Sequence, residues 1–296
     1  MPDKVIDARS HDLGDGFTVG RVLPHRTQRM VGPFIFLDHM GPLDMEAPIP
    51  DSRDVRPHPH IGLSTVTYLF DGQMTHRDSL GCEQVITPGA LNWMTSAAGI
   101  THSERFDGMR EGGGRIEGVQ SWVAMPEANE ADDPSFDHYD ADVLPSFNED
   151  GVAGRVIAGS AYGLTSPART FSPLFYVHAE MAEGARLALP AGHAERAVFV
   201  AGGEIELGGQ RYHGNQMLVF ASGDTPTIRA TSGARVMLLG GEPLGPRYIW
   251  WNLVSSRREQ IMQAAADWKA GKMPLPPMDN TESIPLPDTP FPPKKA

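Results

Sequence analysis

Cysteine is almost absent from this chain, since Cys82 is the one cysteine among 296 residues. A single thiol excludes an intrachain disulfide and is typical of proteins in a reducing compartment. The sequence also lacks an apolar run of transmembrane length, and its beginning has no signal-peptide core. We therefore expect a cytoplasmic protein without a membrane partner.

An excess of positive charge is missing as well. The chain has 25 lysines and arginines against 37 aspartates and glutamates, which gives a formal net charge of −12. Because phosphate contacts need a basic face, this balance disfavours direct binding to nucleic acid. Nucleotide-binding loops are missing too. Gly14-Asp-Gly16 followed by Gly20 lacks dinucleotide spacing and indicates a hairpin turn, and Gly112-Gly-Gly114 has no following Lys-Ser/Thr.

The chain is rich in turns between short apolar strands. Its 32 glycines and 26 prolines are scattered, and a hydrophobic content of 40% is enough for a core. Leu63–Phe70 and Met74–Asp78, separated by the hairpin signal Asp71-Gly72, indicate antiparallel strands. The pattern predicts an all-β barrel or sandwich. The length allows one large domain or two of about 140 residues each.

The second half of the chain repeats the same order of strands and glycine turns, which indicates an internal duplication. Its strand candidates include Thr170–Ala179, Arg196–Ala201 and Ala234–Leu239. An acidic stretch at residues 126–150 predicts a linker between the halves. One helix is expected from the capping box Ser256-Arg-Arg-Glu259 to Gly271. The proline-rich residues 272–296 predict a tail that is either extended on the surface or disordered.

The strongest chemical signal consists of two short motifs, Arg56-Pro-His-Pro-His60 and His102-Ser-Glu104. In a strand, residues i and i+2 project from the same face. If the two strands are adjacent, four side chains converge: His58, His60, His102 and Glu104. Three imidazoles and one carboxylate are a ligand set that suits a divalent transition metal.

Such a site would carry a net charge of about +1 and leave two positions of an octahedral ion open. An ionised substrate oxygen could take one position, and dioxygen or water the other. Fe(II) suits the mixed ligands, and no thiolate competes because Cys82 is distant in the sequence. Two alternatives stay open. A closed tetrahedral zinc would use the four ligands structurally, and metal-free core histidines would need partners for their buried ring nitrogens.

Several further side chains are candidates for the surroundings of this site. His76 could orient a ligand from the return strand or could be a surface residue. A pocket beside the metal, or alternatively plain core, could contain Phe36, Trp93, Met94, Gln120 and Trp122. In the second half, His178-Ala-Glu180 and His193-Ala-Glu195 have ligand spacing, but no further pair completes a second set.

Three stretches closely resemble the pirin family of bicupins: Arg56-Pro-His-Pro-His-Ile-Gly-Leu-Ser-Thr-Val-Thr-Tyr68, His76-Arg-Asp-Ser-Leu-Gly81 and Gly99-Ile-Thr-His-Ser-Glu104. The resemblance covers nearly the whole chain. It implies two stacked cupin β-barrels of jelly-roll type with a C-terminal helix. Residues 1–135 would form the N-terminal cupin domain with the metal site. Residues 136–296 would form the C-terminal cupin domain without metal, including the helix and the proline-rich tail.

The resemblance also implies one metal, usually iron, with His58, His60, His102 and Glu104 as ligands and Glu104 as candidate base. Some members are quercetin 2,3-dioxygenases, so we expect an Fe(II)-dependent dioxygenase acting on a flavonol such as quercetin or a similar enol-bearing aromatic. A eukaryotic member is linked to transcription, so the alternative is a metal-binding, redox-sensing regulator that acts through a protein partner. Where the family often has Met or Pro after the glutamate, this chain has Arg105, expected near the pocket mouth.

Overall fold

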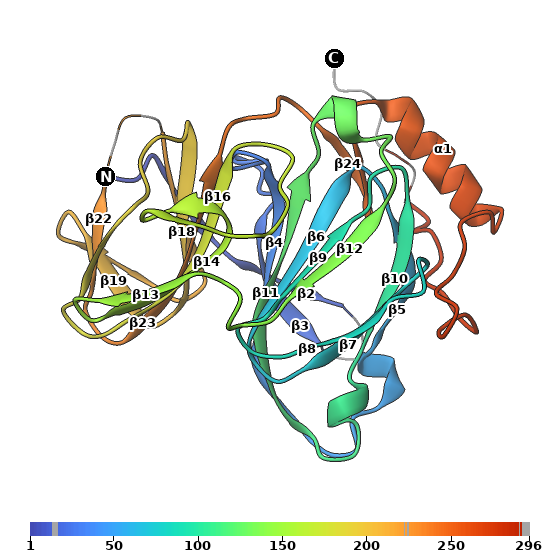
Figure 1. The fold of residues 1–296 in the computed structure, drawn as a ribbon, viewed down its shortest axis with the longest axis horizontal. Coiled ribbons are helices and arrows are strands. Elements are labelled where there is room, and N and C mark those ends of the chain that lie inside the picture. Colours follow the sequence, from blue (N-terminus) through green and yellow to red (C-terminus); the bar gives the residue numbers. More distant parts are fainter. Residues whose placement is uncertain (14–16, 222, 224, 290, 292–296) are drawn as a thin grey trace.

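The computed structural model describes residues 1–13, 17–221, 223, 225–289 and 291. The turn expected at residues 14–16 lies outside the described residues. Two β-barrels lie side by side, and a helix lies on the outer flank of the first (Figure 1). This arrangement confirms the all-β class with two barrels and a C-terminal helix. Within the described ranges, no helix is long and apolar enough to cross a membrane.

The first barrel consists of a larger and a smaller sheet. The larger sheet has the order β12 (Ser135–Tyr139), β9 (Leu91–Thr95), β6 (Leu63–Asp71), β11 (Gly114–Ala124), β4 (Phe34–Met45), β3 (Thr18–Leu23) and β2 (Arg9–Asp12). The smaller sheet has the order β5 (Val55–His60), β10 (Ile100–Arg105), β7 (Met74–Asp78) and β8 (Glu83–Ile86). Short 3₁₀ helices connect strands at η1 (Asp51–Arg53), η2 (Asp107–Met109) and η3 (Glu127–Asn129).

The second barrel repeats this plan. Its larger sheet has the order β1 (Lys4–Asp7), β21 (Gln216–Phe220), β18 (Glu195–Gly202), β23 (Ala234–Gly241), β16 (Leu174–Met181), β14 (Val152–Ala161) and β13 (Ser146–Glu149), with β15 (Leu164–Thr165) beside β14. Its smaller sheet has the order β17 (Arg186–Ala188), β22 (Thr227–Ala230), β19 (Glu204–Leu207) and β20 (Gln210–His213). Each strand of the first barrel has a counterpart at the same place in the second barrel, where β1 takes the place of β12, and this confirms the expected duplication.

Each terminal segment of the chain joins the barrel that the other half of the chain forms. Strand β1 belongs to the second barrel, where it pairs with β21 in antiparallel register. The hairpin of β24 (Tyr248–Trp250) and β25 (Leu253–Ser255) contacts β5 of the first barrel and forms the bridge Ile61↔Leu253 directly after that strand. In Figure 1 the N-terminus accordingly lies at the second barrel, and helix α1 lies at the first. The division of the chain at residue 135 stays a prediction.

The larger sheets of the two barrels pack against each other through an apolar core that both contribute. On β6 the alternation of side chains sends Val66 and Tyr68 into this core, together with Tyr176 and Phe199 from the second barrel. A buried hydroxyl also bonds across this interface, because the Tyr68 hydroxyl lies 3.0 Å from Nδ1 of His178. The opposite face of β6 points into the first barrel. The packing therefore leaves one face of each strand for the barrel interior.

Helix α1 (Arg258–Lys269) begins differently from the prediction. Its N-cap is Arg257, which makes no side-chain capping bond, so the predicted capping box is wrong. Ser256 instead donates from its hydroxyl and its N–H to the buried carboxylate of Glu130, at 3.0 and 2.7 Å. A carboxylate from the first barrel thus holds the start of the helix. The helix packs onto the first barrel through three buried side chains: Ile261, Ala264 and Trp268.

The tail after the helix runs along strands β5 and β10. The N–H of Ile284 donates to the carbonyl of Pro57 at 2.8 Å. Arg105 donates from Nε and Nη2 to the two carboxylate oxygens of Asp279, at 2.8 and 2.7 Å. Arg105 therefore binds the tail, and its expected place near a pocket mouth stays a prediction. The tail is therefore laid on the first barrel up to residue 289, and residues 290 and 292–296 lie outside the described residues.

Candidate metal centre

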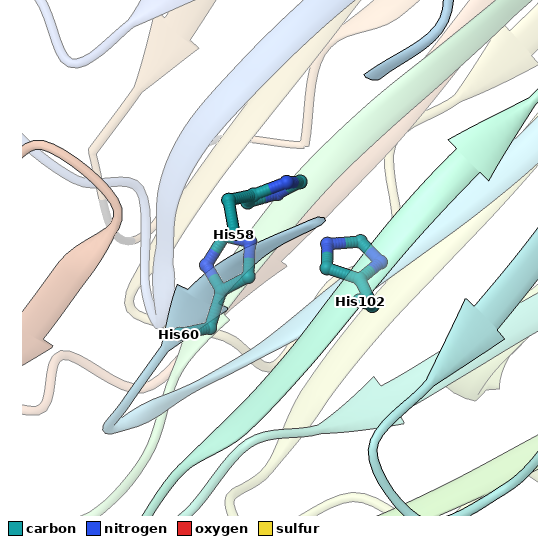
Figure 2. A group of neighbouring side chains, drawn as sticks. All are labelled: His58, His60 and His102. Atoms are coloured by element: carbon teal, nitrogen blue, oxygen red, sulfur yellow. The ribbon is translucent and has the colours of Figure 1, made fainter. Parts of the chain in front are cut away.

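Three histidines converge inside the first barrel. Strands β5 and β10 are antiparallel, with His58 opposite His102 and His60 opposite Ile100. The imidazole centroids of the three histidines lie between 4.5 and 5.0 Å apart. Their ligand atoms lie within 4.8 Å of one another, and Figure 2 shows the rings turned toward a common point. The sequence spacing therefore brought these three residues together as predicted.

The local sequence explains how β5 can carry two of these ligands. Pro57 and Pro59 cannot donate to a neighbouring strand, and β5 is an edge strand of its sheet, where proline is tolerated. Gly62 follows with φ of +68°, and a Cβ there would clash with the carbonyl oxygen of Val254. Glycine thus permits the close approach of β25 behind the ligand strand.

Each of the three rings has its Nδ1 atom engaged by a neighbour. Nδ1 of His58 lies 2.8 Å from the carbonyl of Arg56, and Nδ1 of His60 lies 3.0 Å from the carbonyl of Asn252. Because a carbonyl only accepts, both Nδ1 atoms carry the proton. Nδ1 of His102 lies 3.3 Å from Nδ1 of His76. Such outer contacts are typical of histidine ligands and leave Nε2 for a metal.

The ring nitrogens also pass a direct test of fit to a metal ion. Nε2 of His102 is buried and has no hydrogen-bond partner, which is costly for a polar atom unless something binds it. Burial lowers the pKa of His58 to about 4 and holds the pKa values of His60 and His102 well below the usual range. The rings are therefore neutral near pH 7, which is the protonation state that ligates metals.

Glu104 is buried near the triad, but it does not belong to the group of mutually close ligand atoms. A β-bulge shifts the register between His102 and Glu104. Gln120 Nε2 donates to both carboxylate oxygens at 2.8 and 3.0 Å, and Thr67 donates at 3.2 Å. Burial raises the pKa of Glu104, and these bonds oppose that rise. Its role as fourth ligand stays a prediction.

The candidates for the surroundings of the site separate into two groups. Trp122 meets His60 edge-on, with centroids 5.2 Å apart, and stacks on Phe36 at 4.0 Å. Gln120 binds Glu104, as described. Trp93 belongs instead to the apolar core between the barrels. His76 is buried and contacts His102, so it is not the surface residue of the alternative interpretation.

Two groups that contact the histidines were not predicted from the sequence. The carbonyl of Asn252 reaches His60 across 192 residues, and no spacing rule connects positions so far apart. Phe136 on β12 stacks on His76, with centroids 4.3 Å apart and planes inclined by 17°. Asn252 reaches this place because the β24–β25 hairpin of the C-terminal segment returns to the first barrel.

The histidines of the second half serve other purposes. His178 lies between the barrels, bonded to Tyr68 and 3.3 Å from the carboxylate of Glu180. His193 lies beside Phe175, with ring centroids 5.1 Å apart. Over the described ranges, the second barrel shows no group of three close ligand atoms.

The duplicated barrels and the histidine group together define a class: a bicupin with a candidate metal site in its first barrel. The pirin family matches residues 16–123, and the pirin C-terminal cupin domain matches residues 176–274. A pirin-like protein of Caulobacter vibrioides is 55% identical over 289 residues, which cover 97% of this chain and 100% of that protein. This chain belongs to the pirin family.

Two solved structures extend the comparison. Quercetin 2,3-dioxygenase from Acinetobacter baumannii has a TM-score of 0.89 at 32% identity and covers 97% of this chain and 95% of its own. A bacterial pirin from Escherichia coli in complex with nickel(II) has a TM-score of 0.61 at 14% identity, covering 81% of this chain and 99% of its own. At that identity the second likeness is one of fold.

Proposed function

We propose that this protein is a metal-dependent dioxygenase, with Fe(II) as its ion, that acts on a flavonol such as quercetin or a similar enol-bearing aromatic. One observation carries the proposal: the ligand nitrogens of three buried imidazoles lie within 4.8 Å of one another, and Nε2 of His102 among them has no hydrogen-bond partner. The likeness to a quercetin 2,3-dioxygenase supports the substrate class. A reducing cytoplasm would suit the ferrous state.

The ion would be held by His58, His60 and His102, with Glu104 as fourth ligand. Bound there, it supplies Lewis-acid polarisation of a substrate oxygen and one-electron redox chemistry toward dioxygen. The rings need no rearrangement of protons to bind it, since the carbonyls of Arg56 and Asn252 already hold two of the Nδ1 protons.

Glu104 would also accept the proton of the substrate hydroxyl. Burial raises the pKa of this carboxyl group, which brings it toward the range of a useful general base. The proton would pass to one carboxylate oxygen and leave the electron pair on the substrate oxygen as an enolate. Gln120 and Thr67 fix the orientation of the carboxylate through their hydrogen bonds. The stacked Phe36 and Trp122 would offer an aromatic wall beside His60.

The test is oxygen uptake by iron-loaded protein with quercetin, prepared anaerobically. We expect one dioxygen consumed per flavonol lost, and no uptake by His102→Ala. Glu104→Gln should keep the histidines and lose most of the rate. Trp93→Phe, a change in the core between the barrels, is the matched control. Absence of uptake by fully loaded protein across a flavonoid panel would contradict the proposal.

A redox-sensing regulator that acts through a protein partner is the second candidate. The observation that favours it is the contact of the triad with the C-terminal segment, because His60 bonds to Asn252 of the β24–β25 hairpin. Through this bond, a change at the metal could affect an element on the outer flank of the barrel. Affinity capture should then yield one partner from the ferric or the ferrous form alone. Equal capture by both forms would count against it.

A further inference from the structure

We propose that His76 is a positioning residue that, together with Asp78, places the proton of His102 on Nδ1 and so keeps Nε2 free for the metal. The inference rests on the proposed metal site and concerns a side chain that is not itself a ligand. Strand β7 carries both residues and pairs with β10, with Asp78 opposite His102 and His76 opposite Glu104. All of these side chains are buried.

With His76 neutral and Asp78 ionised, the chain of contacts has one consistent arrangement of protons. His76 Nε2 lies 3.0 Å from Oδ2 of Asp78, and a carboxylate accepts, so Nε2 of His76 carries the proton. A neutral imidazole with a proton on Nε2 has a lone pair on Nδ1. That lone pair faces Nδ1 of His102 at 3.3 Å, so His102 must donate from Nδ1. Its Nε2 then has the lone pair that a metal needs.

The neighbours of the pair hold this arrangement in place. The other oxygen of Asp78, Oδ1, accepts from the backbone N–H groups of Leu80 and Cys82 at 2.9 and 3.1 Å. The carboxylate therefore cannot rotate without losing both bonds. Phe136 stacks on the His76 ring and restrains it from the other side. The ring that directs His102 is thus itself fixed.

His102 differs in this respect from the other two ligands. His58 and His60 donate to backbone carbonyls, which no side-chain substitution removes. His102 depends on a side-chain relay, so substitutions at His76 and Asp78 can change its protonation pattern while the triad itself is intact. The relay also connects His102 to a carboxylate, and partners of this kind raise the basicity of a histidine ligand.

Asp78→Asn is the most informative variant. The asparagine oxygen would keep the bonds from Leu80 and Cys82, which turns its amide nitrogen toward His76. That nitrogen donates, so His76 would move its proton to Nδ1, and His102 would have to carry its proton on Nε2. The substitution thus preserves the shape and reverses both tautomers. We expect metal affinity to fall by about 10- to 100-fold, the range known for outer-shell partners.

The experiment uses the full chain with ¹⁵N-labelled histidine. Long-range ¹H–¹⁵N spectra of metal-free protein should show His102 protonated at Nδ1 and His76 protonated at Nε2, with both reversed in Asp78→Asn. Zinc affinity is then measured by competition with a chelator. His76→Phe keeps the stacking on Phe136 and removes the acceptor, so it should bind zinc weakly. His76→Gln restores an acceptor and should recover most of the affinity.

His138→Phe is the matched control, because His138 lies on β12 two residues from Phe136 and bonds to Asn92 away from the triad. It should bind zinc like the unmodified protein. Protonation of His102 at Nε2 in the unmodified protein would overturn the inference. Equal zinc affinity of His76→Phe and His76→Gln would overturn it as well. Neither measurement requires turnover, so a failure of the dioxygenase proposal would leave this test unaffected.

Discussion

The two barrels share one strand order but differ in what fills them. In the first barrel, strands β5 and β10 place His58 opposite His102. The corresponding strands of the second barrel, β17 and β22, place Leu187 opposite Ile228, and both are buried. Apolar side chains such as Phe220 complete that interior. One scaffold thus carries a polar ligand set in one copy and a hydrocarbon core in the other.

The difference separates stability from chemistry. Burial of apolar surface stabilises a fold by about 25 cal/mol per Å². Buried imidazoles and carboxylates cost free energy unless each finds a partner. The ligands of the first barrel carry that cost, whereas Leu187, Ile228 and Phe220 in the second barrel gain free energy on burial. We therefore expect core substitutions in the second barrel to change stability, and substitutions at the triad to change metal affinity.

Phe220→Ala should have the largest effect. Phe220 is 1% exposed in the core of the second barrel, and removal of its ring leaves a cavity. We expect a loss of about 3–5 kcal/mol in the free energy of unfolding, measured with urea. The folded variant should bind zinc as before. Weaker zinc binding by the folded variant would show that the barrels are not independent in this respect.

Acid should destabilise the metal-free protein through the first barrel. Burial lowers the pKa of His58 from 6.5 to about 4. Between these values the unfolded chain binds more protons than the folded one, so stability falls as the pH falls and levels off below the lower value. His58 alone would contribute on the order of 3 kcal/mol between the two limits. Urea unfolding from pH 7 to pH 4 measures this.

His58→Phe is the comparison for that pH series. It removes one titrating group from the buried set, so its stability should depend less on pH over the same window. If the curves of the variant and the unmodified protein run parallel, His58 is not the group that titrates.

Metal removal should lower the free energy of unfolding by an amount similar to that pH effect, and the melting temperature should fall with it. A ligand that binds only the folded state at 100 times its dissociation constant stabilises it by about 2.7 kcal/mol. Calorimetry with zinc and after chelation should show this difference. His102→Ala should show none of it, because one of three converging nitrogens is gone. An unchanged zinc-dependent shift in that variant would mean that the ion binds elsewhere.

The features that could be predicted from the sequence are those that depend on local contacts. His58, His60 and His102 were predictable because the period of a strand fixes which side chains share a face. The all-β class followed from short strands and frequent turns, and the two barrels followed from the resemblance to the pirin family. The capping box failed because Glu130, distant in the sequence, binds Ser256 more closely than the helix does. The exchange of β1 into the second barrel depends on tertiary packing, for which no local pattern exists.

The smallest expected effect concerns the outer side of the first barrel, and it is specific to one contact there. Arg105 is buried under the tail, where it binds Asp279 through two hydrogen bonds. Arg105→Met keeps the apolar stem and leaves a carboxylate without its partner, which should cost about 2 kcal/mol. The amide of Ile284, which donates to Pro57, should exchange faster with deuterium.

Arg115→Met is the matched control on the same barrel. Arg115 is about half exposed, with its closest carboxylate oxygen 3.8 Å away, and such surface pairs contribute about 0–1 kcal/mol. Its loss should change neither stability nor exchange at Ile284. If Arg105→Met also leaves exchange at Ile284 unchanged, the tail is held by its apolar contacts and not by the ion pair.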